Sequence, residues 1–208
     1  MTASSGSPAI LPPTIESWVA ADRALDAGRM RNLMAPTVVL ASPLTDAFDF
    51  TGPDDVAAVF AAAFEVLADV AVARVTGAGA DWAIHATNTV NGRLLGEIQW
   101  LHLGDDGLID HFTLLMRPVA SAAELLAVIG PALARRGLMA PGPAKAASAL
   151  GRMPAMQLHM AEKRILPGCA RAADPTVPTQ QHQLSRSSPA APTPRGTRAP
   201  ATRRSRAR

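Results

Sequence analysis

The spacing of apolar residues predicts three helices in the first 67 positions. Residues 15–25 place apolar side chains near one face of a helix, and we expect Thr14 to cap that helix. A short second helix is expected over 29–35, because Pro36 ends it. The clearest helical period belongs to Val56, Val59, Phe60, Ala63, Phe64 and Leu67.

Alternation and β-branched residues predict the strands. Two short strands are expected before the third helix, and four more follow it: 37–41, 47–50, 70–76, 82–90, 93–103 and 108–116. Asn91-Gly92 lies between two of these segments, and this pair favours a two-residue hairpin turn because it tolerates positive φ. The element order is therefore that of an α+β protein with a largely antiparallel sheet.

The Asn91-Gly92 turn also predicts which side chains share a face of the sheet. It pairs Val90 with Arg93, so Asn88, Glu97 and Gln99 lie on one face. Ile98, Trp100 and His102 lie on the other. If Leu103 pairs with Leu108, then Asp110, Phe112 and Leu114 join the Gln99 face, whereas a one-residue shift would move them to the opposite face.

Composition divides the chain into a core-forming part and a tail. Residues 1–139 hold eight arginines and fifteen acidic residues, a net charge of −7, whereas residues 140–208 hold twelve basic and two acidic residues, a net charge of +10. No Trp or Phe follows Phe112. Ser121 and Glu124 predict a capping box at the start of one more helix. We expect a flexible arm (1–13), a folded domain (14–118), an appended helix (119–137) and a largely disordered tail (138–208) that is rich in Pro, Ala and Arg.

Several classes of protein are excluded by composition. A single cysteine, Cys169, cannot form an internal disulfide, and no stretch is long and uncharged enough to span a membrane. The N-terminus has no basic segment followed by an apolar one, so we expect a cytoplasmic protein. His85, His102 and His111 lack the close spacing of zinc ligands, so no metal is expected. The tail arginines would bind polyanions without specificity, but no aromatic residues accompany them, and a solvated extension is favoured over a nucleic-acid site.

An ordered set of segments resembles the SnoaL-like branch of the nuclear transport factor 2-like superfamily. The resemblance covers about 14–117 and rests on Leu33-Met34-Ala35, Val38–Pro43, Phe50–Val56, Asp105–Ile109 and Arg117-Pro118. It implies a cone-shaped α+β barrel, in which a curved antiparallel or mixed sheet wraps around N-terminal helices and a pocket opens between them. Many members are homodimers through the convex sheet face, which here would present Ile98, Trp100 and His102.

The same resemblance leaves the function open, because the superfamily holds isomerases, dehydratases, hydrolases, cyclases and non-catalytic binders. Gln99 stands where related ketosteroid isomerases have an acid, and Ser42, before Pro43, stands where they have the catalytic base. The chain has no Tyr to match their oxyanion-binding residue. Steroid-type isomerisation by that mechanism is therefore not expected.

The sequence is compatible with two functions. The first is a cofactor-free acid–base enzyme for an apolar, polyketide- or terpenoid-like substrate, with Asp110 and Glu97 as catalytic residues. Its ligand-binding residues would be Gln99, Asn88, Trp18, Phe60, Phe64, Phe112, Leu114 and Ser42. The second is a non-catalytic ligand-binding or dimeric assembly module. A carboxylate at the base of a closed apolar cavity would favour the enzyme, and carboxylates paired with arginine at the rim would favour the module.

Overall fold

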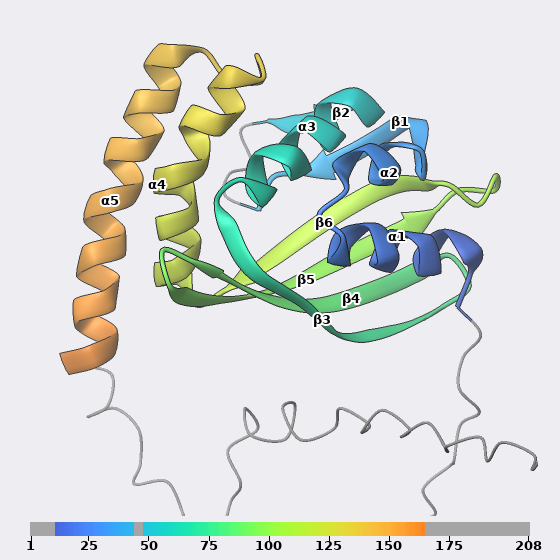
Figure 1. Cartoon of the computed structure of the whole chain (residues 1–208), viewed down its shortest axis with the longest axis horizontal. Coiled ribbons are helices and arrows are strands. Elements are labelled where there is room, and N and C mark those ends of the chain that lie inside the picture. The colour runs from blue at the N-terminus through green and yellow to red at the C-terminus, as the bar shows by residue number, and fades with distance from the viewer. Residues whose placement is uncertain (1–10, 44–47, 165–208) are drawn as a thin grey trace, which may run out of the picture. The chain divides into compact units, whose positions relative to one another are not determined.

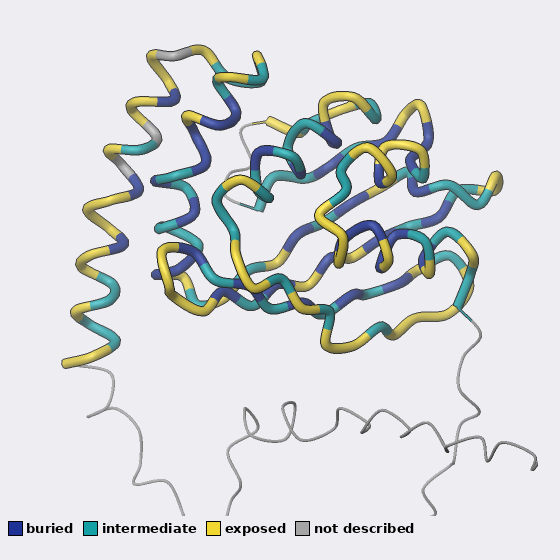
Figure 2. Tube along the Cα trace, viewed as in Figure 1, coloured by how far each residue is buried: buried dark blue, intermediate teal, exposed yellow. Residues whose placement is uncertain are grey.

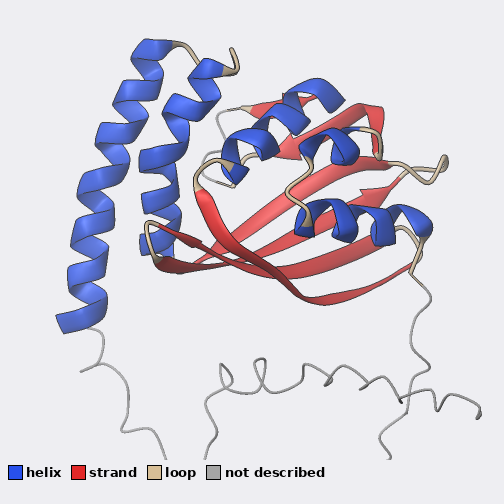
Figure 3. Ribbon diagram, in the orientation of Figure 1, coloured by secondary structure: helices blue, strands red, loops and turns tan. Residues whose placement is uncertain are grey.

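A curved mixed sheet of six strands forms the body of the molecule (Figures 1 and 3). The computed structural model describes residues 11–43 and 48–164. The strand order is β2-β1-β6-β5-β4-β3, and only the β1–β6 pair is parallel among these strands. The strands are β1 (Met34–Ala41), β2 (Asp49–Thr51), β3 (Leu67–Ala78), β4 (Asp81–Val90), β5 (Arg93–Leu103) and β6 (Ile109–Arg117). The expected α+β class is confirmed.

Three N-terminal helices cover one face of this sheet: α1 (Pro13–Arg23), α2 (Ala27–Arg31) and α3 (Pro53–Phe64) (Figure 1). Proline opens both α1 and α3, where the missing N–H costs nothing. Thr14 does not cap α1 as expected, because its hydroxyl donates to the carbonyl of Gly107 at 2.6 Å. The buried side of α1 carries Ile15, Trp18 and Asp22 at helical spacing, so a carboxylate is buried together with the apolar residues.

The β4–β5 hairpin has the expected register, with Val90 opposite Arg93 and Ile84 opposite Gln99. The next pairing differs from the expectation, because Gln99 lies opposite Leu114 rather than Phe112. The shift is of two residues, so Phe112 and Leu114 keep the inner face and both are buried. The register slips between His102 and Leu103, which is the mark of a β-bulge.

Because of the bulge, Asp110 does not lie on the inner face of the sheet as expected. Leu103 pairs with Ile109 and His102 pairs with His111, so Asp110 is the unpaired extra residue of β6. The inner-face position goes to Ile109, which is fully buried. Asp110 lies instead beside the turn that joins β5 to β6. Its Oδ2 is so near Gly104 of that turn that a Cβ added to this glycine would lie 3.1 Å from it.

Two helices follow the sheet, α4 (Val119–Arg135) and α5 (Pro141–Arg164). The appended helix expected over 119–137 corresponds to α4, but the expected disorder from residue 138 is wrong as far as residue 164. The Ser121–Glu124 capping box is also absent, because Ser121 donates to the carbonyl of Leu94 at 2.8 Å and Glu124 accepts from Asn91. The expected arm over 1–10 and the tail over 165–208 lie outside the described residues.

The two C-terminal helices pack unusually closely through small residues. A Cβ on Gly151 of α5 would lie 2.7 Å from the backbone nitrogen of Ala127, and one on Gly130 of α4 would lie 3.0 Å from the carbonyl oxygen of Ala144. Among the α5 residues whose burial is described, Ala144, Gly151 and Ala155 are buried. Figure 2 shows buried and exposed positions alternating along this helix. An interface of alanine and glycine gives no aromatic or strong apolar signal, which is why the sequence pattern missed this helix.

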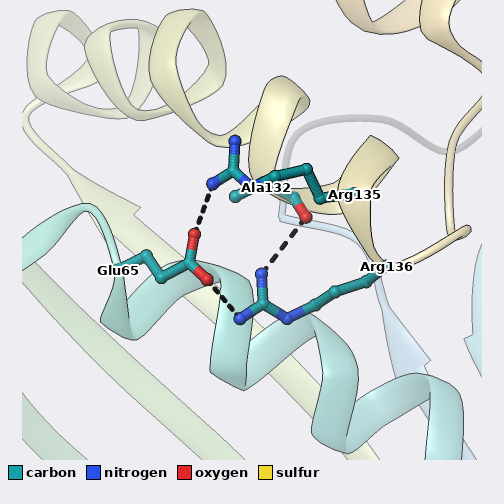
Figure 4. A network of polar contacts seen from close by, with 4 residues as sticks. All are labelled: Glu65, Ala132, Arg135 and Arg136. Carbon is teal, nitrogen blue, oxygen red and sulfur yellow. Dashed lines mark hydrogen bonds and ion pairs between the residues drawn. The ribbon is translucent and has the colours of Figure 1, made fainter.

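An ion-pair network ties the end of α4 to the end of α3 (Figure 4). Glu65, just after α3, accepts from both Arg135 and Arg136, and Arg136 also donates to the carbonyl of Ala132 at 3.2 Å. These hydrogen bonds hold the pKa of Glu65 below its ordinary value. The network therefore fixes α4 beside α3, where both helices contribute walls to the cavity described next.

Candidate functional site

A cavity of about 450 Å³ lies between the inner face of the sheet, α3 and the α4–α5 pair. Its walls are almost entirely apolar, and they include side chains from α3, the sheet and α4: Val59, Phe60, Phe64, Leu40, Leu114, Met116, Leu125, Ile129 and Leu133. Among the described residues, four polar side chains reach it: Asp22, Ser42, Asn88 and Glu97. A large apolar cavity with a few convergent polar groups is typical of a small-molecule site.

Gln99 is the centre of a buried hydrogen-bond network beneath this cavity. Its Nε2 donates to Oδ2 of Asp22 at 3.1 Å and to Oε1 of Glu97 at 2.8 Å. Its Oε1 accepts from the indole Nε1 of Trp18 at 2.8 Å. Asn88 Nδ2 donates to the second oxygen of Glu97 at 3.3 Å. One amide therefore bridges two buried carboxyl groups, one from α1 and one from β5.

Both carboxyl groups hold protons more tightly than usual. Burial raises the pKa of Asp22 to about 6, and repulsion from Glu97 adds to the rise, while the Gln99 hydrogen bond and the charge of Arg23 oppose it. Burial also raises the pKa of Glu97, against the hydrogen bonds from Gln99 and Asn88. Neither carboxylate forms an ion pair with an arginine or lysine among residues 11–43 and 48–164. Carboxyl groups whose pKa values are raised by burial are found at acid–base sites more often than elsewhere in proteins.

Asn88 adds an unsatisfied acceptor to the polar end. Its Oδ1 is buried and has no hydrogen-bond partner, although Nδ2 is bound to Glu97. Leaving a buried acceptor unpaired costs about 1–3 kcal/mol. A hydroxyl or N–H group of a bound ligand would remove that cost.

A cluster of aromatic rings packs beside these polar groups. Trp18 packs edge-on against Phe60, with ring centroids 5.5 Å apart, and its ring is tilted against that of Phe112, with centroids 4.8 Å apart. Phe60 continues the stack to Phe64 at 6.0 Å. The stack holds the Trp18 indole where it donates to Gln99, so the rings position the network as well as filling the core.

The residues expected from the sequence divide into three groups in the structure. Six line the cavity: Ser42, Phe60, Phe64, Asn88, Glu97 and Leu114. Trp18, Gln99 and Phe112 are fully buried around it. Asp110 is not among the lining residues, because the bulge removes it from the inner face.

Asp22 is the site residue that sequence reasoning missed. The signal was its spacing, seven positions after Ile15 and four after Trp18, on the apolar side of the first helix. A carboxylate that interrupts an apolar helix face is buried when that face is buried. In this chain the buried carboxyl group of Asp22 is linked to that of Glu97 by hydrogen bonds from Gln99.

No cluster of three or more His, Cys, Asp or Glu side chains that could hold a metal occurs in the described part of the chain. None of the helices in those same residues is long and apolar enough to cross a membrane.

Two solved structures resemble this chain at the level of the fold. One is an uncharacterized bacterial protein with a cystatin-like fold from Silicibacter pomeroyi, 26% identical, with a TM-score of 0.56 over 58% of this chain and 85% of that one. The other is a steroid delta-isomerase from Pseudomonas aeruginosa, 23% identical, with a TM-score of 0.56 over 61% of this chain and 93% of that one. This chain has the nuclear transport factor 2-like fold.

Within the nuclear transport factor 2-like fold, the assignment to the SnoaL-like branch stays a prediction. No protein-family model matches the sequence, and a search of curated proteins returned no significant match. The fold accounts for the cavity between sheet and helices, and the α4–α5 pair adds a further wall to it.

Proposed function

We propose that this protein is a cofactor-free acid–base enzyme that moves a proton within an apolar small molecule bearing a carbonyl group. The observation that carries the proposal is the Asp22–Gln99–Glu97 arrangement at the polar end of an apolar cavity. Two buried carboxyl groups without a cationic partner lower the stability of the folded protein. Carboxyl groups in such environments are used by enzymes as general acids and bases, which supports the proposal.

The hydrogen bonds assign different roles to the two carboxyl groups. Glu97 accepts from both Gln99 and Asn88, which favours its ionised form, whereas Asp22 accepts only from Gln99. Glu97 is therefore the base, and Asp22 is the acid. Because Glu97 raises the pKa of Asp22 and both groups bind the Gln99 amide, they titrate as a coupled pair.

The proposed reaction is a proton shift. Glu97 takes a proton from the carbon beside the carbonyl, and the C–H electron pair moves into the enolate while the carbonyl oxygen accepts a hydrogen bond from protonated Asp22. Where the substrate carries a carbon–carbon double bond next to that carbon, the enolate extends over the double bond as a dienolate. Return of the proton from Glu97 to the far carbon of that double bond then gives the conjugated isomer and restores the enzyme. Gln99 positions both carboxyl groups throughout, and Asn88 Oδ1 is available to a substrate hydroxyl.

The cavity also indicates the class of substrate. Its volume of about 450 Å³ and its aromatic and aliphatic walls suit a fused-ring or branched hydrocarbon skeleton with one polar end. We therefore keep the polyketide- or terpenoid-like substrate class as part of this proposal.

Deuterium exchange tests the proposal without knowledge of the natural substrate. The protein is incubated in heavy water with a panel of bulky apolar ketones, and incorporation beside the carbonyl is followed by mass spectrometry. We expect wash-in that falls by at least about 100-fold in Glu97→Gln and Asp22→Asn, in line with the worth of a general acid or base. The matched control is Asp110→Asn, outside the cavity, which should exchange like the wild type.

Two outcomes would count against the enzyme. Ketones that bind in the cavity without any exchange would favour the alternative of a non-catalytic binding module. Exchange that survives both cavity substitutions but is lost in Asp110→Asn would place the chemistry elsewhere.

We also propose that the protein is a homodimer through the outer face of the sheet. Trp100 is 53% exposed and Ile98 is 40% exposed on that face. His102 lies beside them, and its pKa is raised mainly by the hydrogen bond with Asp81. A partly exposed tryptophan among apolar neighbours on a sheet face is typical of an association surface.

A further inference from the structure

A second hollow, of about 310 Å³, lies where the C-terminal half of α5 meets α4 and the start of β5. Four cationic side chains line it: Arg93, Arg152, Lys163 and Arg164. No residue of this basic groove lines the apolar cavity, so it is a separate feature. Cations gathered in a concave surface attract anions more strongly than the same charges on a flat surface.

The positive charges of the basic groove outnumber the negative charge that the lining residues supply. None of the four cations forms an ion pair within the described residues. The carboxylate in the groove, Glu124, accepts from Asn91 Nδ2 at 2.6 Å. Against four cations, the lining residues of the groove include one carboxylate, that of Glu124. Like charges held together without a counter-charge are destabilising unless an anion joins them.

His159 supplies a further unpaired polar atom in the same groove. Its Nδ1 lies 3.3 Å from Oε2 of Glu162, and its Nε2 is buried without a partner. Arg152, His159 and Lys163 lie on one side of α5, at spacings of seven and four.

We propose that the basic groove binds a phosphate or diphosphate group. Arginine guanidinium groups present paired N–H donors that match phosphate oxygens, and lysine adds a compact charge. Met156 and Met160, which complete the lining, are 59% and 48% exposed and offer an apolar contact next to the charges. The recognised chemistry is thus a phosphate group attached to an apolar moiety, as in a phosphorylated small molecule or a phospholipid headgroup.

Pyrophosphate binding to the full chain tests this proposal by calorimetry. The variant Arg152→Gln with Lys163→Gln removes two charges from the groove, and Arg29→Gln with Arg74→Gln removes two exposed charges elsewhere. The basic residues beyond 164 are the same in both, so their non-specific attraction is matched. We expect affinity to fall at least about tenfold in the groove variant and less than twofold in the control. No binding, no loss in the groove variant, or an equal loss in both would overturn the proposal.

Vesicles then distinguish the two sources of phosphate. Phosphatidylglycerol vesicles that bind the wild type but not the groove variant, with phosphatidylcholine vesicles binding neither, would identify a lipid headgroup. Pyrophosphate binding without vesicle binding would identify a soluble phosphorylated ligand. Vesicle binding that is unchanged in the groove variant, together with unchanged pyrophosphate affinity, would contradict the site.

Discussion

At the residue scale, the chemistry depends on a few polar side chains placed on an otherwise apolar surface. Gln99 satisfies Trp18, Asp22 and Glu97 at once, and each of those groups is buried. Two carboxylates sharing one amide are less stable in their ionised form than they are in water. The two carboxyl groups therefore lower the free energy of unfolding at neutral pH, and this loss of stability can be measured.

The first prediction concerns the pH dependence of that loss. The folded protein binds the Asp22 proton more tightly than the unfolded chain does, because the pKa rises from 3.8 to about 6. Folding stability therefore falls as the pH rises from about 4 to 6 and stays lower above. Asp22→Asn lacks this penalty, so at pH 8 it should be more stable than the wild type by up to about 3 kcal/mol. At pH 3.5 the difference should be small. Urea unfolding at both pH values measures it, and a variant that is less stable at pH 8 would contradict the burial of an ionised Asp22.

The second prediction concerns Gln99 as the hub. Gln99→Leu keeps the volume but leaves the Trp18 indole and both carboxyl groups without their shared partner. We expect a loss of more than about 2 kcal/mol in unfolding free energy, since each orphaned group costs about 1–3 kcal/mol. Gln157→Leu, the same change at an exposed position of α5, should have little effect. Equal stability of the two variants in thermal unfolding would mean that the network is not formed.

Sequence reasoning found part of this site for a definite physical reason. A two-residue turn fixes the pairing of its hairpin, so the shared face of Asn88, Glu97 and Gln99 followed from Asn91-Gly92 alone. Asp110 was misplaced because alternation does not reveal a bulge. Asp22 was missed because it lies 77 residues from Gln99, and their contact depends on how α1 packs on the sheet.

At the scale of elements, the order of helices and strands over residues 13–117 followed from periodicity and turn signals, whereas α5 did not. The bounds were less accurate, since the helix expected over 29–35 ends at Arg31 and β1 already begins at Met34. The buried residues of α5 include Ala144, Gly151 and Ala155, and small side chains of this kind stand out little from their neighbours in a hydropathy pattern. Its packing depends instead on how closely two backbones approach, a property that composition does not show.

The third prediction tests this close packing. Gly151→Ala adds a Cβ that would meet backbone atoms of Ala127 and Ala123 at 2.7 and 2.8 Å, so α5 has to move. We expect a loss of about 1–3 kcal/mol, the usual cost of overpacking. Gly142→Ala on the same helix meets nothing within 4 Å and should be neutral or stabilising by up to about 1 kcal/mol. If the two substitutions shift the melting temperature equally, α5 does not pack on α4 as described.

At the scale of the whole molecule, the two faces of the sheet have different environments. The inner face meets helices and the cavity, whereas the outer face leaves Leu94, Ile98, Trp100 and Leu115 exposed. Parity predicted which side chains of the β4–β5 hairpin share a face, and the family resemblance indicated which of the two faces lies inside. The tail arginines and the residues beyond 164 lie outside the described part of the chain.

The fourth prediction follows from that outer face. Sedimentation of the full chain at micromolar concentration should show a dimer, and Trp100→Glu should shift it to a monomer, because a buried carboxylate would face its symmetry mate. Val119→Glu changes an even more exposed apolar residue, at the start of α4, and should leave the dimer intact. A wild-type monomer, or a dimer unaffected by Trp100→Glu, would contradict this use of the face.

The proposed acid–base enzyme requires that Asp22 and Glu97 form one coupled, proton-binding pair at the base of the cavity. Carbon-13 NMR of the side-chain carboxyl carbons, followed from pH 3 to 9, measures this directly. We predict that Asp22 titrates near pH 6, that Glu97 titrates above its ordinary value, and that Asp22→Asn lowers the midpoint of Glu97 by removing its acidic neighbour. If both carbons titrate near pH 4 and neither responds to substitution of the other, the proposed acid–base pair does not exist.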